Sequence, residues 1–384
     1  MDIKTFKDLE KFTLKQNNII NEPQLFFKNK KSKAFNDFEY SNDYNKGIGG
    51  NMQVFYGKDR INNDDLAVKV EIKNKKQSDA YNEIITLTRL KEVSQIPKFY
   101  FYEFENNKNV VAETLFGPSL QKFYDFNNYM FDHILISIIG IQLINILKNI
   151  HSKGIIHNDV KPNNICWGRF QNTNYIEREK FFLIDFGYAR KILEITDIKN
   201  GNEKINNHFY RHYSNAYENK YAGSCEFMAI TISEGLRPSR RTDIQELIYT
   251  LLFLIKKGLP WSNVKAKNHL ERCKKMGDLK KNIDLNILFD GTPQELLFIY
   301  KSSLKLDFQE EPDYEVYIIL FNNIFRRFGI NGEIKQKNFL FGKINDIFSF
   351  PNNLSTNIDN SNPFDTLFNG YPFDNIYPNP KYSA

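Results

Sequence analysis

Two short runs of polar residues could together transfer a phosphoryl group. Residues 157–164 read His-Asn-Asp-Val-Lys-Pro-Asn-Asn, and residues 185–187 read Asp-Phe-Gly. Asp159 could orient a hydroxyl group and accept its proton, and Lys161 could offset charge on the migrating phosphoryl group. Magnesium prefers oxygen ligands such as amide and carboxylate oxygens. Asn164 and Asp185 could supply one of each.

Each run alone is weak evidence, and it is their order and spacing that carry weight. His-x-Asp followed by Asn also occurs in small-molecule phosphotransferases, and Asp-Phe-Gly is a common turn sequence because Asp and Gly suit turns. Here, however, Asp185 directly follows the apolar run 181–184, which predicts a buried strand. The end of a strand is where a metal-binding carboxylate is expected.

A glycine-rich segment and a lysine lie upstream. Residues 47–54 read Gly-Ile-Gly-Gly-Asn-Met-Gln-Val, and a hairpin of this kind lets backbone amides approach phosphates. Alone it could be an ordinary hairpin, and Met52 stands where a further glycine is expected. We predict phosphate binding by three glycines, Gly47, Gly49 and Gly50.

The strand-like run 66–69, Leu-Ala-Val-Lys, carries a lysine in apolar surroundings. A buried ammonium is costly unless it is paired. Lys69 could instead extend to solvent from an edge strand, and Glu83 could lie on a solvated helix face. Because both loops follow in order downstream, we predict an ion pair between Lys69 and Glu83, with Lys69 binding the α- and β-phosphates.

The pattern of apolar residues predicts an α+β protein of two lobes. The smaller lobe is strand-rich with one main helix over 78–93, and Gly117-Pro118 separates it from a helical larger lobe. The remaining predicted strands cover 98–105 and 109–114, and the predicted helices cover 131–152, 243–257, 293–305 and 314–328.

Composition restricts the class of protein and its environment. The chain of 384 residues is 41% hydrophobic, enough for a substantial core, and its net charge of +6 suits acidic or phosphorylated partners without requiring nucleic acid. Three scattered cysteines without metal spacing favour a reduced intracellular compartment, cytoplasmic or nuclear, over a disulfide framework or a zinc site. We expect neither a signal peptide nor a membrane span, because the most apolar window, 134–150, is short and interrupted by polar residues.

The chain resembles the casein kinase 1 group of protein kinases, which includes the vaccinia-related kinases. The similarity rests on the two runs above and on Leu-Phe-Gly-Pro-Ser-Leu at 115–120, Pro-Ser-Arg-Arg-Thr-Asp at 238–243, Gly-Leu-Pro-Trp at 258–261 and Glu-Pro-Asp-Tyr at 311–314. It covers roughly residues 41–335. We therefore expect an N-terminal extension over 1–40, an N-lobe over 41–115, a C-lobe over 116–335 and a flexible tail over 336–384.

The resemblance implies a bilobal Ser/Thr protein kinase that uses ATP and Mg²⁺ on protein substrates with acidic or phosphorylated sites. It assigns Asp243 to brace the catalytic loop, and it makes Arg240 and Arg241 a candidate docking point for the substrate. A solvated basic pair before a helix is the alternative for these arginines. The implied adenine pocket is lined by Val54, Ala67, Cys166 and Ile184.

Three departures from the family pattern leave questions open. Asn158 replaces an arginine that often binds an activating phosphate, so we expect activity without activation-loop phosphorylation. Met52 should weaken nucleotide binding or slow the reaction, without removing a metal ligand or abolishing activity. The position behind the adenine pocket is either Glu113, which then needs a partner, or Ala112. A catalytically weak or dead kinase fold used as a scaffold, and a small-molecule phosphotransferase, remain alternatives.

Overall fold

The computed structural model describes the chain at residues 38–40, 52–59, 64–72, 79–105, 108–127, 131–168, 180–197, 208–212, 215–218 and 221–328. The predicted tail, nearly all of the predicted N-terminal extension, and Gly47, Gly49 and Gly50 lie outside these residues. The chain divides into two compact units, with the main boundary between Leu115 and Phe116, and each is described by itself.

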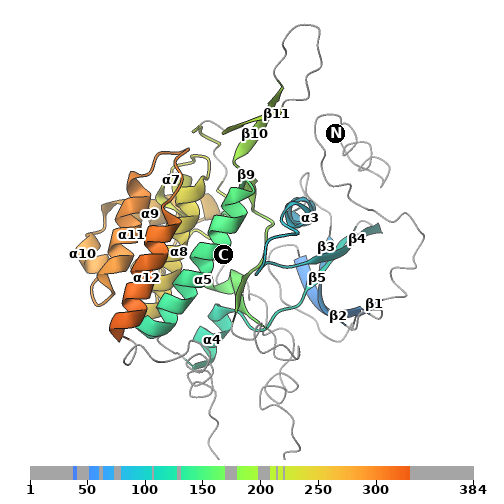
Figure 1. Cartoon of the computed structure of the whole chain (residues 1–384), viewed down its shortest axis with the longest axis horizontal. Helices are drawn as coiled ribbons and strands as arrows, with labels where there is room; N and C mark the ends of the chain where they lie inside the picture. Colours follow the sequence, from blue (N-terminus) through green and yellow to red (C-terminus); the bar gives the residue numbers. More distant parts are fainter. Residues whose placement is uncertain are drawn as a thin grey trace, which may run out of the picture. The chain divides into compact units, whose positions relative to one another are not determined.

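In its described residues, the first unit is a five-stranded antiparallel sheet with one helix packed against it (Figure 1). The strand order is β1-β2-β3-β5-β4. The strands are β1 (Phe38–Tyr40), β2 (Met52–Asp59), β3 (Asp65–Ile72), β4 (Phe99–Glu105) and β5 (Lys108–Thr114), and the helix is α3 (Asp79–Arg89).

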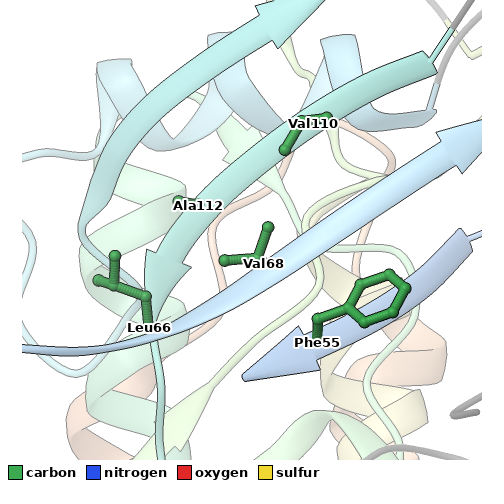
Figure 2. Packing of buried hydrophobic residues seen from close by; sticks show 5 residues of the cluster. All are labelled: Phe55, Leu66, Val68, Val110 and Ala112. Atoms are coloured by element: carbon green, nitrogen blue, oxygen red, sulfur yellow. The ribbon is translucent and has the colours of Figure 1, made fainter. Parts of the chain in front are cut away.

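The two faces of this sheet carry different side chains because side chains alternate along a strand. One face holds an apolar cluster, shown in Figure 2: Phe55, Leu66, Val68, Val110 and Ala112. On the other face, Ile84 of α3 packs against Val111. Ala67 and Lys69, which alternate with Leu66 and Val68, therefore point toward the α3 face.

The second unit is mainly helical. The helices among its described residues are α4 (Leu120–Asn127), α5 (His133–Ser152), α7 (Ile230–Ser233), α8 (Arg240–Lys256), α9 (His269–Asn282), α10 (Leu285–Leu288), α11 (Gln294–Lys305) and α12 (Tyr314–Phe328). Helix α5 packs against α12 and α8, and α8 packs against α11 (Figure 1). By length and composition α5 could cross a membrane, but most of it is buried inside this unit, as in a core helix.

Short strands in the second unit position its loops. They form the antiparallel pairs β6 (Ile155–Ile156) with β9 (Arg190–Lys191), β7 (Ile165–Trp167) with β8 (Phe181–Leu183), and β10 (Leu193–Asp197) with β11 (His208–His212). The 3-10 turn η1 (Pro162–Asn164) precedes β7. Ile165 at the start of β7 pairs with Leu183 at the end of β8, so residue 164 lies next to residue 184, which directly precedes Asp185.

The α+β fold with a small sheet-rich unit and a larger helical unit confirms the predicted fold class. Helix α8 begins at Arg240 rather than at the predicted Asp243, because Ser239 is its N-cap and the Ser239 amide donates to the Thr242 hydroxyl at 3.2 Å. Helix α9 was not predicted, because it is rich in charged residues and therefore lacks a clear apolar pattern. It buries only four residues: Cys273, Met276, Gly277 and Lys280.

The sequence favoured reduced cysteines over a disulfide, and this prediction was wrong for two of the three cysteines. Cys225 and Cys273 form a disulfide, whereas Cys166 is a buried free thiol. The partners are 48 residues apart and follow no spacing motif, so only the fold brings them together.

Candidate active site

A buried aspartate on α8 holds the start of the loop that carries Asp159. The amide of His157 donates to Asp243 Oδ2 at 2.7 Å, and the amide of Asn158 donates to Oδ1 at 2.8 Å. His151 of α5 contacts the same carboxylate through Nε2 at 2.9 Å. The loop backbone is therefore fixed to the core of the helical unit, which is the bracing geometry expected of Asp243.

A second carboxylate, three residues along α8, fixes the other side of Asp159. Glu246 Oε2 accepts the Val160 amide at 2.9 Å, and Thr250 donates its hydroxyl to the Val160 carbonyl at 3.0 Å. Burial, followed by the nearby charge of Asp243, raises the pKa of Glu246 well above its usual range. Backbone amides on both sides of Asp159 are thus bonded to one helix.

The side chain of Asp159 is buried and receives donors from three directions. Its Oδ2 lies 2.8 Å from Lys161 Nζ and accepts from Asn164 Nδ2 at 3.1 Å. Its Oδ1 accepts from the backbone amide of Ser224 at 2.9 Å. Lys161 also donates to the Ser224 hydroxyl at 2.9 Å. The carboxylate is therefore held in one orientation.

These contacts keep Asp159 ionised although it is buried. Burial alone would raise the pKa of this carboxyl, but the charge and hydrogen bond of Lys161 outweigh it and the pKa is lowered. Burial would lower the pKa of Lys161, and the opposing attraction of Asp159 raises it instead. The pair is a carboxylate and an ammonium at neutral pH, as a proton acceptor and a charge-neutralising cation require.

The β7–β8 pair places Asn164 beside Ile184, the residue that precedes Asp185. The amide of Ile184 donates to the Asn164 carbonyl at 2.9 Å, which places the next residue, Asp185, beside the loop. Because Asn164 uses its Nδ2 on Asp159, its amide oxygen remains for a cation. An amide oxygen and a carboxylate form a hard donor set that fits Mg²⁺.

The backbone at Asp185 is in the left-handed region, with φ of 66°. Non-glycine residues seldom adopt this region unless the surroundings enforce it. The next residue, Phe186, is buried and packs edge-to-face on His157 at 4.8 Å between ring centroids. His157 Nε2 also lies 3.0 Å from the Ile184 carbonyl, so contacts on both sides of Asp185 maintain its conformation.

In the sheet-rich unit, Lys69 contacts two buried carboxylates. Its Nζ lies 2.7 Å from Glu83 Oε1 and 2.6 Å from Glu113 Oε1. The predicted pair with Glu83 is present, and Glu113 has the partner that its burial requires. Glu113 stands opposite Ala67 in the β3–β5 register, on the α3 face, whereas Ala112 lies in the apolar cluster on the other face. The structure thus favours Glu113 over Ala112 at this position.

The four residues predicted to line the adenine pocket are divided between the two units. Val54 stands opposite Lys69 in the β2–β3 register, so it shares a face with Ala67. Cys166 and Ile184 are buried in the helical unit, on β7 and just after β8. Their contacts with a nucleotide stay predictions, as does phosphate binding by the glycines outside the described residues.

Arg240 and Arg241 lie in the first turn of α8 and both donate to backbone carbonyls. Arg240 donates to Gln309 at 2.9 Å, and Arg241 donates to Leu306. Arg241 is partly buried, and burial lowers its pKa. Both arginines therefore hold the segment after α11, and substrate docking stays a prediction.

Sequence reasoning missed Gly223 and Ser224. Gly223 has φ of +96°, and a Cβ there would lie 2.9 Å from the Asn158 carbonyl oxygen and 3.3 Å from Asp159 Oδ1. Only glycine allows this close approach to the loop. A Gly-Ser dipeptide occurs in many loops, so the sequence carries no signal that it contacts Asp159.

The comparisons with known proteins agree with this geometry. The protein kinase domain family matches residues 40–309. Casein kinase I homolog 3 from Schizosaccharomyces pombe is 27% identical over 281 residues, which cover 73% of this chain and 61% of that protein. The match thus leaves more than a third of that relative's length uncovered. The similarity to casein kinase I homolog 3 agrees with the resemblance to the casein kinase 1 group that the motifs indicated. The chain belongs to the protein kinase family.

Proposed function

We propose that this chain is a Ser/Thr protein kinase that transfers the γ-phosphoryl group of ATP, with Mg²⁺, to hydroxyl groups of proteins. The observation that carries the proposal is the buried Asp159 carboxylate, kept ionised by Lys161 and oriented by Asn164 and the Ser224 amide. A carboxylate held in this way can orient an acceptor hydroxyl and take its proton.

Each polar side chain of the site has a distinct role in this proposal. Lys161, two residues after Asp159 as in Ser/Thr kinases, would neutralise the transferred phosphoryl group. Lys69, paired with Glu83, would bind the α- and β-phosphates. Asn164 and Asp185 would hold the Mg²⁺ ion, which when bound neutralises charge on the phosphates.

We also propose a preference for acidic or phospho-primed protein substrates. The net charge of +6 and the casein kinase 1 similarity support this preference. The arginine pair at 240 and 241 supports it less, because both side chains already bind backbone carbonyls. Peptides that differ only in having acidic, phosphorylated or neutral residues around one serine test the preference, and equal rates on all three would contradict it.

Radiolabelled ATP with casein as acceptor tests the transfer itself. Replacement of Asp159 by Asn should abolish label transfer, because the amide cannot accept the proton. The matched control is Asp290→Asn, the same chemical change at an exposed position, and it should leave transfer unchanged. ATP binding without transfer by the unmodified chain would instead favour the scaffold alternative.

A further inference from the structure

The disulfide joins helix α9 to the segment Tyr221–Met228, which we call the activation segment. Cys225 of this segment bonds to Cys273 of α9, and both are buried. Lys280 of the same helix donates to the Cys225 carbonyl at 2.6 Å and to the Met228 carbonyl at 2.8 Å. Helix α9 therefore holds this segment through a covalent bond and through hydrogen bonds.

The held segment contacts the catalytic loop one residue away from the disulfide. Ser224 precedes Cys225, and its amide donates to Asp159 Oδ1 at 2.9 Å while its hydroxyl accepts from Lys161 at 2.9 Å. A single peptide unit separates the disulfide from the contact with the catalytic carboxylate. A change in the position of Cys225 is thus transmitted to Asp159 with little intervening freedom.

An exposed histidine lies beside both sulfur atoms. His269 Nδ1 is 3.5 Å from Cys225 Sγ, and its Nε2 is 3.5 Å from Cys273 Sγ. In the reduced form an imidazole at this distance can take a thiol proton and stabilise the thiolate, which is the attacking species in thiol–disulfide exchange. The pair therefore has a neighbour that favours thiol–disulfide exchange, and this neighbour is exposed to solvent.

We propose that Cys225 and Cys273 form a reversible disulfide that holds Ser224 against the catalytic loop and so regulates the enzyme. The inference rests on the proposed kinase function. The oxidant is a small disulfide such as oxidised glutathione. One cysteine thiolate attacks it, forms a mixed disulfide and releases one glutathione thiolate. The second cysteine attacks the mixed disulfide, forms the protein disulfide and releases the second glutathione thiolate. The two protons from the protein thiols pass to the two released glutathione thiolates.

The test compares the full chain after treatment with oxidised glutathione and after dithiothreitol. Mass spectrometry after thiol labelling should show two fewer free thiols in the oxidised sample. Amide hydrogen exchange in the peptide spanning 221–228 should be several-fold slower in that sample, and phosphoryl transfer to casein several-fold faster. Cys273→Ser should show the exchange and transfer rates of the reduced wild type under both treatments. His269→Gln should slow oxidation without changing either end state.

Different results separate failure of this inference from failure of the kinase assignment. Equal exchange in the activation segment of both samples would overturn the inference. Zinc that copurifies with the chain, with loosening of the segment by a chelator rather than by dithiothreitol, would overturn it too. A redox-dependent exchange rate with no transfer in either state would support the reversible link to the catalytic loop and refute the kinase function.

Discussion

Replacement of Lys69 by Met should destabilise the sheet-rich unit because it removes the ammonium between two buried carboxylates. Lys69, Glu83 and Glu113 are exposed by 5%, 0% and 1%. With contacts of 2.6 and 2.7 Å, each pair has a gross attraction of roughly 6 kcal/mol at an effective dielectric constant of about 20, before the cost of desolvation. Breaking a buried pair by removing one partner costs about 3–5 kcal/mol, which is the expected loss here.

Two matched variants separate stability from function at the same cluster. Glu113→Gln and Glu83→Gln each remove one carboxylate and leave Lys69 with the other, so each should change the free energy of unfolding by only about 1 kcal/mol. Their effects on catalysis should differ. Glu83→Gln should lower transfer about 10²-fold, because Lys69 loses the partner that positions it. Glu113→Gln should preserve transfer and lower the KM for ATP, since Glu113 competes with the phosphates for Lys69.

Urea unfolding followed by far-UV circular dichroism, together with ATP titrations of the transfer rate, measures both effects. Adding Glu113→Gln to the Lys69→Met variant should recover part of the lost stability, because one unpaired carboxylate is removed. The electrostatic reasoning is wrong if Lys69→Met unfolds at the wild-type urea concentration. The assigned roles are wrong if the two glutamate variants lose transfer equally.

Three further predictions concern the helical unit. Gly223→Ala should lower kcat strongly, because the new Cβ would lie only 2.9 Å from the Asn158 carbonyl oxygen of the catalytic loop. Gly291→Ala is the control, since Gly291 also has a positive φ but a Cβ there would meet no atom within 4 Å, and kcat should stay unchanged. Equal effects of the two substitutions would refute the steric argument. Burial lowers the pKa of His157 from its usual value of 6.5. Just below pH 6.5 the unfolded chain therefore binds a proton that the folded chain does not. The free energy of unfolding should fall as the pH drops below 6.5, by at most about 1.4 kcal/mol per pH unit. In His157→Gln this slope, measured by urea unfolding at several pH values, should become shallower, and an unchanged slope would exclude His157 as its cause. Asn158 donates to the Tyr188 carbonyl at 3.3 Å in place of a phosphate-binding arginine, so phosphatase treatment should leave transfer intact; its abolition would show that another group binds an activating phosphate.

The sequence predicted those parts of the site that depend on local patterns. Asp185 follows a buried strand and Lys69 lies on another, because apolar runs of this length have few other solutions. The partner of Glu113 was not predictable, since it depends on the register that places Glu113 opposite Ala67. For the same reason the contact of Ser224 with the catalytic loop was missed, as it joins residues 65 positions apart.

Besides Lys161 in the same loop, three other parts of the chain restrain Asp159, and they differ in how readily they can move. Helix α8 contributes Asp243 and Glu246, both buried, which bind the loop backbone. Asn164 is fixed by the β7–β8 pair, which also belongs to the core. Ser224 alone among these residues lies on a connecting segment between short elements, and such segments open at a lower free energy than core helices and strands. Regulation of the carboxylate without unfolding the core should therefore act through the segment that carries Ser224, which is the segment that the disulfide joins to α9.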